Sequence, residues 1–384
     1  MIIHVVKPGE TLTQIAREYG VSVESIVKNN RLLYSESLVV GQTIVIILED
    51  QEEPTKPWGD IWVNGYAYPY INTNTLSQVL PSLTYITIFG YGFTTEGNLI
   101  KPDEEKERYL IKRAYEENTI PVFLLSALSE DGTFSSEKAS LLFQDPDLQE
   151  IVLQNIIIEM QEKGYQKIDL DFEFIPPEDN ENYFRFIEKT VQMLHPYGFL
   201  VHVDLAPKTS DTQQGLLYEA HDYRRIGEIA DTVLIMTYEW GYTYGPPMAV
   251  APINKVEEVV RYAVERIDYR KIFMGIPNYG YDWALPFVRG VTKADTIGNE
   301  EAVALARRVG AEILFDTTAM SPYFYYTDAY NIQHIVWFED ARSIYAKLSL
   351  IAKYRLLGAG YWNLMRPFTQ NWLVLNSLYD VIKG

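Results

Sequence analysis

The stretch Lys-Ile-Asp-Leu-Asp-Phe-Glu-Phe, residues 167–174, alternates apolar and acidic side chains without a break. Successive side chains of a β-strand point to opposite faces, so Asp169, Asp171 and Glu173 are predicted to share one face, about 6.5–7 Å apart. The apolar residues of the other face indicate a strand that is buried in a core. Burial makes ionised carboxylates costly, so at least one of the three is expected to keep its proton near neutral pH. A carboxylic acid held in this state can act as a general acid.

Apolar segments of strand length recur from residue 59 to the end of the chain, and amphipathic helical segments separate them. This alternation is typical of an α/β protein, and eight strands in about 325 residues predict a (β/α)8 TIM barrel. We expect the strands at 61–66, 85–89, 121–125, 167–173, 200–205, 232–236, 271–276 and 358–362. We expect helices at 105–117, 146–163, 180–194, 256–266 and 341–357.

Three segments are expected to lie outside the barrel proper. Residues 283–335, before the last strand, hold a helical segment at 300–310 between strand-like runs, which predicts a small α+β insertion. Residues 1–48 follow the order strand, helix, helix, strand and are predicted to form a small βααβ domain. Residues 49–58 are acidic, contain proline and lack periodicity, as is typical of a linker.

Composition excludes several classes of protein. The chain has no cysteine, which excludes disulfides, thiol nucleophiles and cysteine zinc sites and fits a reducing compartment. Its net charge of −19 argues against nucleic acid or anionic lipid as a partner. No apolar run approaches the ~20 residues of a membrane span. The first ten residues lack a basic segment followed by an apolar one, so no secretory signal peptide is expected.

The N-terminal unit carries a recognisable pattern. The segments His-Val-Val-Lys-Pro-Gly-Glu-Thr-Leu-Thr-Gln-Ile-Ala at 4–16, Asn-Asn at 29–30 and Leu-Val-Val-Gly-Gln-Thr-Ile at 38–44 together resemble a LysM module. The resemblance implies binding of N-acetylglucosamine-containing glycans such as peptidoglycan and chitin. It assigns the glycan groove to two loops, with Gly9, Glu10, Thr11 and Leu12 in the first and Asn30 and Leu32 in the second. A LysM fold without glycan affinity is the alternative, because a fold alone does not establish function.

The strand ends of the predicted barrel carry three further signatures. The acidic strand, Met-Thr-Tyr at 236–238 and Trp362 in the last strand together resemble glycoside hydrolase family 18. The resemblance covers about residues 59–384, with 283–335 as the family's insertion domain. It implies a retaining hydrolase in which the N-acetyl group of the substrate acts as nucleophile, and it implies neither a metal nor a cofactor.

This family resemblance assigns roles to individual residues. Glu173 protonates the glycosidic oxygen, Asp171 orients the substrate acetamide, Asp169 supports Asp171, and Tyr238 holds the acetamide oxygen. Trp362 forms the floor of the sugar pocket. Further substrate-binding residues are expected near it, namely Glu239, Asn278, Tyr279 and Tyr66. His202 and Asp204, on one face of strand 200–205, are instead interpreted as a satisfied polar layer inside the barrel.

Residues 238–253 differ from the chitinase pattern, and with the LysM module they resemble the spore cortex-lytic N-acetylglucosaminidases of endospore-forming bacteria. This implies cleavage of peptidoglycan from the spore cortex during germination, by a monomeric enzyme made in the mother cell and deposited on the spore. Some positions depart from the family. Gln166 and Lys167 replace the usual Asp-Gly before the acidic motif, Glu239 replaces an Asp, and Leu-Ser-Ala at 125–127 replaces a glycine-rich signature, which argues against chitin as the natural substrate.

Three other functions compete with this interpretation. One is a chitinase-type hydrolase. The second is a metal-dependent hydrolase that uses the same acidic strand, but the five histidines show no ligand spacing. The third is a non-catalytic glycan-binding protein of the spore coat, and the presence of Glu173 argues against it.

Overall fold

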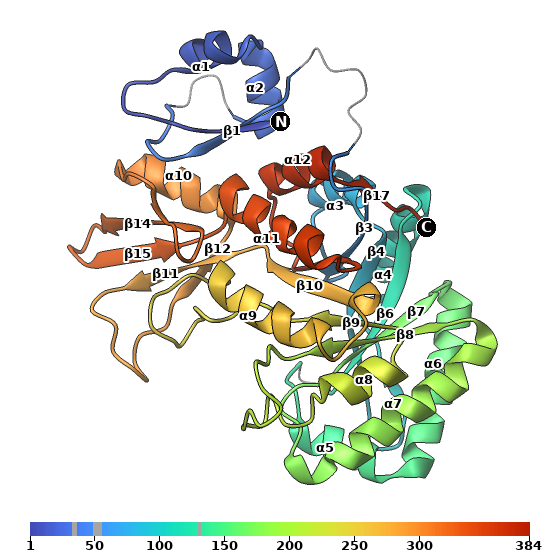
Figure 1. The fold of residues 1–384 in the computed structure, drawn as a ribbon. Helices are drawn as coiled ribbons and strands as arrows, with labels where there is room; N and C mark the ends of the chain where they lie inside the picture. The colour runs from blue at the N-terminus through green and yellow to red at the C-terminus, as the bar shows by residue number, and fades with distance from the viewer. Residues whose placement is uncertain (33–36, 49–55, 130–131) are drawn as a thin grey trace.

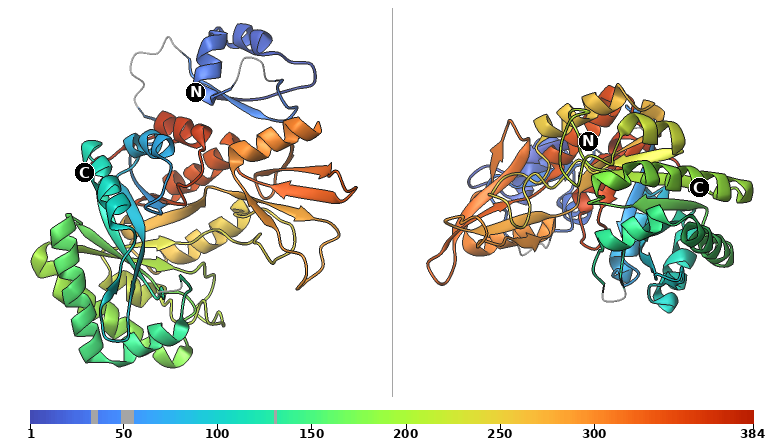
Figure 2. Two further views of the ribbon diagram at one scale, coloured as in Figure 1. Left: turned by 180° about the vertical axis from the view of Figure 1, so that it is seen from behind. Right: turned by 90° about the horizontal axis from the view of Figure 1, so that it is seen from below.

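The computed structural model describes residues 1–32, 37–48, 56–129 and 132–384. Most of the predicted linker, residues 49–55, lies outside the described residues. The described chain forms three units: a barrel, an insertion beside it, and an N-terminal domain that lies next to α10 and α12 in both views (Figures 1 and 2). None of the described helices is long and apolar enough to cross a membrane.

The predicted (β/α)8 barrel is confirmed. Its parallel strands pair in chain order, and β16 closes the barrel by pairing with β3. Every expected strand overlaps an observed one, because each is a short apolar run between polar loops. The strands are β3 (Asp60–Ala67), β4 (Tyr85–Phe93), β6 (Ile120–Ser126), β7 (Lys167–Asp171), β8 (Leu200–Leu205), β9 (Thr232–Ile235), β10 (Ile272–Pro277) and β16 (Gly358–Trp362). Two short strands, β5 (Leu99–Ile100) and β17 (Asp380–Val381), pair with β4 and β3.

Helices pack around the barrel, and local signals fix their ends. In α6, for example, the Asp145 side chain accepts hydrogen bonds from the first turn, Pro146 occupies the first helical position, and Gly164 ends the helix with a φ of 82°. The helices are α3 (Thr73–Val79), α4 (Glu104–Glu116), α5 (Ser136–Gln144), α6 (Pro146–Lys163), α7 (Asn180–Leu194), α8 (Tyr223–Ile229), α9 (Ile253–Val264), α11 (Ala341–Tyr354) and α12 (Thr369–Leu378).

The insertion is an antiparallel sheet with one helix. The sheet has the order β12-β11-β15-β14-β13 and runs from Gly280 to Trp337, slightly beyond the expected 283–335. The two ends of the insertion approach closely, since a Cβ on Gly280 would lie 2.2 Å from the carbonyl oxygen of Trp337. Its elements are β11 (Gly280–Ala284), β12 (Asp295–Ile297), α10 (Asn299–Val309), β13 (Leu314–Asp316), β14 (Ser321–Thr327) and β15 (Gln333–Trp337).

The N-terminal domain has the expected order of β1 (Ile2–Val5), α1 (Leu12–Tyr19), α2 (Val23–Asn30) and β2 (Thr43–Ile46). Thr11 caps α1 in a reciprocal capping box with Gln14, and Gly20 ends the helix in the left-handed region. The apolar run from Val39 to Ile46 would predict a longer last strand, but the strand begins only at Thr43. The residues before it bind the insertion instead, because the carbonyl of Val40 accepts a hydrogen bond from the Ile313 backbone.

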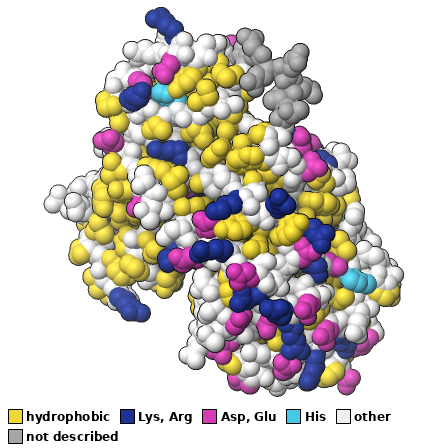
Figure 3. All heavy atoms as spheres, in the orientation of Figure 1, with side chains coloured by type: hydrophobic (Ala, Val, Ile, Leu, Met, Phe, Trp, Pro, Cys, Tyr) yellow, Lys and Arg dark blue, Asp and Glu magenta, His cyan; other side chains and the backbone are white. Residues whose placement is uncertain are grey.

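The N-terminal domain is docked firmly on the rest of the chain. Gln370 of α12 donates to the Thr43 carbonyl and to the Asn30 side chain, and Arg342 of α11 donates to the Gly41 carbonyl. Val39 is buried among apolar residues of the insertion, and Val45 is fully buried in the main core. On the face in Figure 3, hydrophobic side chains are numerous over this domain and the insertion, whereas acidic and basic ones are interspersed over the barrel helices.

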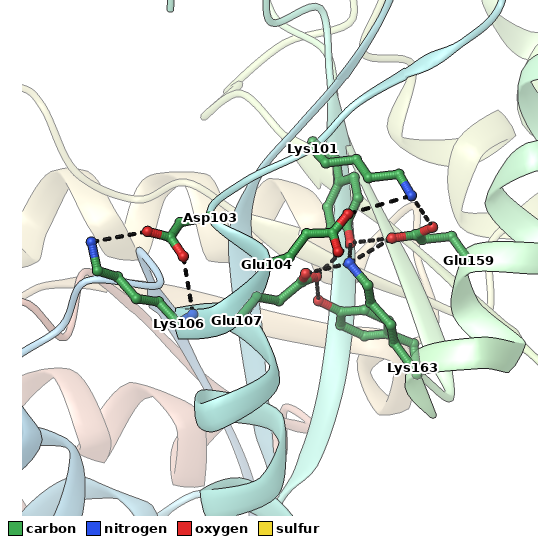
Figure 4. Close-up of polar contacts among 9 residues, drawn as sticks. Lys101, Asp103, Glu104, Lys106, Glu107, Glu159 and Lys163 are labelled. Atoms are coloured by element: carbon green, nitrogen blue, oxygen red, sulfur yellow. Dashed lines mark hydrogen bonds and ion pairs between the residues drawn. The ribbon is translucent and has the colours of Figure 1, made fainter.

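A buried ion cluster joins α4 and α6 to the barrel wall (Figure 4). Lys163 Nζ lies 2.5 Å from carboxylate oxygens of both Glu107 and Glu159 and 2.9 Å from the Tyr91 hydroxyl. Lys101, at the surface, pairs with the second oxygen of Glu159 at 2.7 Å. Two buried carboxylates thus depend on one buried ammonium group.

Gly41 tests the docking of the N-terminal domain. Its φ is 84°, and an added Cβ would lie 1.8 Å from the Ile313 carbonyl oxygen. Gly20 has a similar φ of 67° but open space around a Cβ, so it is the matched control. Gly20→Ala is expected to lower the free energy of unfolding by about 1–2 kcal/mol, which is the cost of the left-handed backbone alone. Gly41→Ala is expected to cost a further ~1–3 kcal/mol for the steric conflict, measured by denaturant unfolding. Equal losses would contradict docking through this contact.

Lys163 tests the buried ion cluster. Lys163→Met removes the ammonium group and leaves two buried carboxylates without it, so the free energy of unfolding is expected to fall by about 3–5 kcal/mol. The control is Lys101→Met, whose side chain is 38% exposed, and it is expected to cost about 1 kcal/mol or less. Thermal and urea unfolding at neutral pH measure both. The opposite order of the two losses would refute this account of the cluster.

Candidate active site

The acidic motif spans the end of β7 and the loop after it. The strand was expected to continue to Glu173 but ends at Asp171, and the backbone then turns, with a φ of 55° at Phe174. Asp169 is fully buried, Asp171 is partly buried, and Glu173 is exposed. The three carboxyl groups therefore lie at increasing height from the barrel interior to its mouth.

The surroundings of these acids raise their pKa values above the usual range. Burial, with smaller contributions from Asp171 and Glu239, raises the pKa of Glu173 to about 8. Burial also raises the pKa values of Asp169 and Asp171 to about 7, and the charge of Asp169 adds to the effect on Asp171. The Glu173 side chain is reached by solvent from the cleft, but protein atoms surround it on the other sides. They reduce the hydration of its charged form, which is why burial still raises its pKa. Its elevated pKa suits an acid that must reach a ligand in the cleft.

Three more residues, Tyr66, Asp204 and His202, join the acids below the cleft. The Tyr66 hydroxyl lies 2.9 Å from Asp169 Oδ2 and 2.8 Å from Asp204 Oδ1. His202 Nε2 lies 3.5 Å from the same Asp204 oxygen and has no hydrogen-bond partner. His202 and Asp204 thus form a buried polar layer as interpreted, and His202 Nδ1 lies 2.7 Å from the Thr232 hydroxyl, but Nε2 leaves the layer incompletely satisfied among the described residues. The missed signal was the position of Asp204, an acid at the carboxyl end of β8 beside Asp171.

The loop after β9 presents the next two residues, Tyr238 and Glu239, at the mouth. Tyr238 lines the same cavity as Asp171 and Glu173, and it fits there because Gly275 of β10 faces its ring: a Cβ on Gly275 would lie 2.7 Å from a ring carbon of Tyr238. Glu239 follows with a φ of 67°. Its carboxylate accepts hydrogen bonds from the hydroxyls of Tyr279 and Tyr281, which oppose the increase that burial causes in its pKa.

Trp362 forms the floor between two cavities. One, of about 530 Å³, includes Asp171, Glu173, Asp204 and Tyr238 in its lining. The other, of about 470 Å³, lies toward the insertion. Trp362 and Glu239 line both. The Trp362 ring contacts those of Tyr66, Tyr68 and Phe89 at centroid distances of 5.7, 6.4 and 5.8 Å.

Two of the expected pocket residues have other positions. Asn278 is buried and donates hydrogen bonds to the carbonyls of Asn363 and Arg366, so its amide fixes the loop after β16 and does not reach the cavities. Tyr66 is buried beneath Trp362 and contacts the acids. Tyr279, by contrast, lines the cavity toward the insertion, as expected.

The expected LysM groove is divided in the structure. Gly9, Glu10, Thr11 and Leu12 lie at the start of α1, where the Glu10 carboxylate accepts bonds from His4 and the Lys7 backbone. The Asn30 side chain is hydrogen-bonded to the backbone of Ile26 and Val45 and accepts from Gln370, although the residue still borders a cavity. Leu32 lines a cavity of about 350 Å³ against α10 and α12. Residues 33–36 of the second loop lie outside the described residues.

One group of side chains in the described part of the chain has the spacing of metal ligands. Oxygen and nitrogen atoms of Asp169, His202 and Asp204 lie within 4.8 Å of one another. Both carboxylates contact the Tyr66 hydroxyl, however, and the buried Lys167 ammonium already supplies positive charge beside Asp169. A divalent cation would displace the Tyr66 hydroxyl from the carboxylates and would be repelled by the Lys167 ammonium group. This set of side chains therefore does not suit a divalent cation.

Comparison with known proteins agrees with this geometry. The family model for glycosyl hydrolases family 18 matches residues 68–366, and the LysM domain model matches 4–46. The chain is 39% identical to the cortical fragment-lytic enzyme of Bacillus subtilis (strain 168), over 100% of this chain and 99% of the relative.

Solved structures are similar as well. The crystal structure of the Bacillus cereus spore cortex-lytic enzyme SleL matches with a TM-score of 0.93 and 33% identity, over 100% of this chain and 98% of that one. A chitinase from Chromobacterium violaceum matches with a TM-score of 0.76 and 26% identity, over 83% and 98%. The chain thus belongs to glycoside hydrolase family 18, as a glycoside hydrolase with an N-terminal LysM domain.

Proposed function

We propose that this hydrolase cleaves N-acetylglucosamine linkages in peptidoglycan, with spore cortex fragments as its substrate during germination. The observation that carries the proposal is the cavity in which Asp171, Glu173, Tyr238 and Trp362 face one another. A protonated carboxyl group, a second acid, a phenol and an aromatic floor are the groups that an N-acetylated sugar needs for retaining, substrate-assisted hydrolysis. Family 18 uses this mechanism in general.

In the first step, the sugar that precedes the scissile bond rests on Trp362. Glu173 donates its proton to the glycosidic oxygen, and the acetamide oxygen of the same sugar attacks the anomeric carbon. Asp171 accepts a hydrogen bond from the acetamide N–H and stabilises the positive charge of the oxazolinium ring. Tyr238 donates a hydrogen bond to the acetamide oxygen, and Asp169 supports Asp171 from below.

In the second step, Glu173 acts as a base. It removes a proton from water, and the water oxygen attacks the anomeric carbon. The oxazolinium ring opens, and the configuration at the anomeric carbon is retained overall. The elevated pKa of Glu173 suits both steps, because the group must donate and then recover a proton at near-neutral pH.

The choice of cortex over chitin rests on the extent of similarity. The cortical fragment-lytic enzyme of Bacillus subtilis matches the chain from end to end, including the LysM domain, whereas the chitinase matches 83% of it. The LysM domain supplies a second contact with the glycan through the loop from Gly9 to Leu12. Deposition on the spore and a monomeric state follow from the same reasoning and remain predictions. A non-catalytic role in glycan binding is disfavoured because the proton donor is present.

Glu173→Gln tests the proton donor. Glutamine has the same shape but no acidic proton, so kcat on N-acetylated glycan is expected to fall by about 10²–10⁴-fold with little change in KM. In the unchanged enzyme, kcat is expected to decrease as the pH rises through about 8, because Glu173 then loses its proton. Release of reducing ends from cortex fragments between pH 4 and 10 measures both. Turnover by Glu173→Gln at the rate of the unchanged enzyme would remove Glu173 from this role.

The acetamide nucleophile makes a separate prediction about the substrate. Cortex glycan from which the N-acetyl groups of glucosamine have been removed is expected to give no product, since no other nucleophile is proposed. Re-acetylation of the same glycan should restore cleavage, which controls for damage to the polymer. Product analysis by mass spectrometry, with cortex, vegetative peptidoglycan and chitin oligomers side by side, also tests the preference for cortex. Activity should persist in EDTA, and cleavage of the de-N-acetylated glycan would contradict the mechanism.

A further inference from the structure

The Tyr66 hydroxyl makes two short contacts with carboxyl groups. Its oxygen lies 2.9 Å from Asp169 Oδ2 and 2.8 Å from Asp204 Oδ1, and all three side chains are buried. A tyrosine hydroxyl has one proton and can donate to one acceptor only. The second contact is a hydrogen bond only if the carboxyl group on that side carries a proton and donates it to the tyrosine oxygen. One of the two aspartates is therefore protonated.

The surroundings of the two acids differ. The Lys167 ammonium group stabilises the negative charge of Asp169, whereas the groups that act on Asp204 are mainly other acids. Burial and the charges of Asp169, Asp171 and Glu173 together raise the pKa of Asp204 well above its usual value. His202, beside it on β8, is held neutral, since burial lowers its pKa well below the usual value. The proton thus belongs on Asp204.

We propose that protonated Asp204 is a positioning residue for the hydrolysis reaction: it donates to the Tyr66 oxygen, and Tyr66 donates to Asp169 Oδ2. This chain of donors keeps Asp169 ionised and fixes the direction of the Tyr66 proton. Asp169 Oδ1 has no hydrogen-bond partner in the structure and is left as an acceptor for Asp171, which also has an oxygen without a partner. Asp204 therefore acts through Tyr66 and Asp169. The inference rests on the proposed function.

Other charged and titratable groups face Asp204 from every neighbouring strand, and they leave this assignment intact. Ionisation of Asp204 would place a further negative charge among acids that are already crowded, so its proton is retained at neutral pH. The groups are Tyr66 on β3, Lys167, Asp169 and Asp171 on β7, Glu173 after β7, His202 on β8, Tyr183 on α7 and Tyr238 after β9.

Two substitutions of Asp204 in the full-length enzyme distinguish this role from a merely structural one. Asn cannot ionise but its amide can still donate to Tyr66, whereas Leu has a similar volume and cannot donate. Asp204→Leu is expected to reduce kcat about tenfold or more with KM changed less than about threefold, and Asp204→Asn to restore most of that loss. In Asp204→Leu the acidic limb of the kcat profile should move modestly to higher pH, because a Tyr66 hydroxyl that no longer accepts a hydrogen bond is a weaker donor to Asp169, and the pKa of Asp169 then rises.

Tyr66→Phe is the second variant, and it is informative if Asp204→Leu does not fold. Tyr66→Phe is expected to shift the acidic limb of the kcat profile to higher pH, because Asp169 then loses its hydrogen bond from Tyr66. The double variant Tyr66→Phe/Asp204→Asn should show no further shift relative to Tyr66→Phe alone, because both changes act on one chain of donors. Asp204→Asn as impaired as Asp204→Leu would overturn the proposal, since the ionised form would then be needed. Asp204→Leu with kcat and a pH profile like those of the unchanged enzyme would also overturn the proposal. So would a double variant whose shift of the acidic limb is the sum of the shifts of the two single variants.

An infrared measurement separates this proposal from the proposed function. The band of a protonated carboxylic acid that remains at neutral pH should weaken in Asp204→Asn, with Glu173→Gln recorded for comparison. This readout does not depend on any substrate, so it stands even if the enzyme cleaves a glycan other than cortex. An unchanged band in Asp204→Asn would mean that Asp204 is ionised, and the proposal would then be wrong.

Discussion

Removal of the acids on β7 and β8 from water is the constraint on which the rest of this molecule depends. Solvated Asp and Glu ionise near pH 4, and an ionised Glu173 could not protonate a leaving group at neutral pH. The barrel wall excludes water from Asp169 and Asp204 and partly from Asp171, and the crowded charges then oppose one another's ionisation. The chemistry of the site follows from where the carboxyl groups lie.

Such a site needs a rigid enclosure. Glycine permits it at the closest approaches: Gly275 makes room for the Tyr238 ring, and Gly280 lets the two ends of the insertion pass each other. Tyr279, just before the insertion, and Tyr281, in its first strand, then hold Glu239 at the edge of the cavity through their hydroxyls. The LysM domain is packed against the insertion and α12 rather than attached by its sequence neighbours alone.

Periodicity and apolar runs were sufficient to predict the barrel, its strand positions, the insertion and the N-terminal domain. They also placed the acidic motif and Trp362 at the mouth, because strand alternation and the position of a strand end are local properties. Asn278 was placed in the sugar pocket wrongly, and the hydrogen bonds of Asn30 were missed, for the opposite reason. Each side chain binds groups far away in the sequence: Asn278 binds carbonyls of the loop after β16, and Asn30 binds the Val45 backbone and the Gln370 side chain. No local pattern records such a partner.

The elevated pKa values have an energetic consequence for the fold. The unfolded chain releases these protons near pH 4, whereas the folded chain holds them until about pH 7 at Asp171 and about pH 8 at Glu173. Between those limits the folded state binds more protons, so the contribution of these groups to stability is complete below pH 4 and is lost as the pH rises toward 8. At the pH where the proton donor is useful, the acids therefore weaken the fold. The apolar core of the barrel and the docked N-terminal domain must offset that loss, which connects the packing of distant parts of the chain to the chemistry of β7.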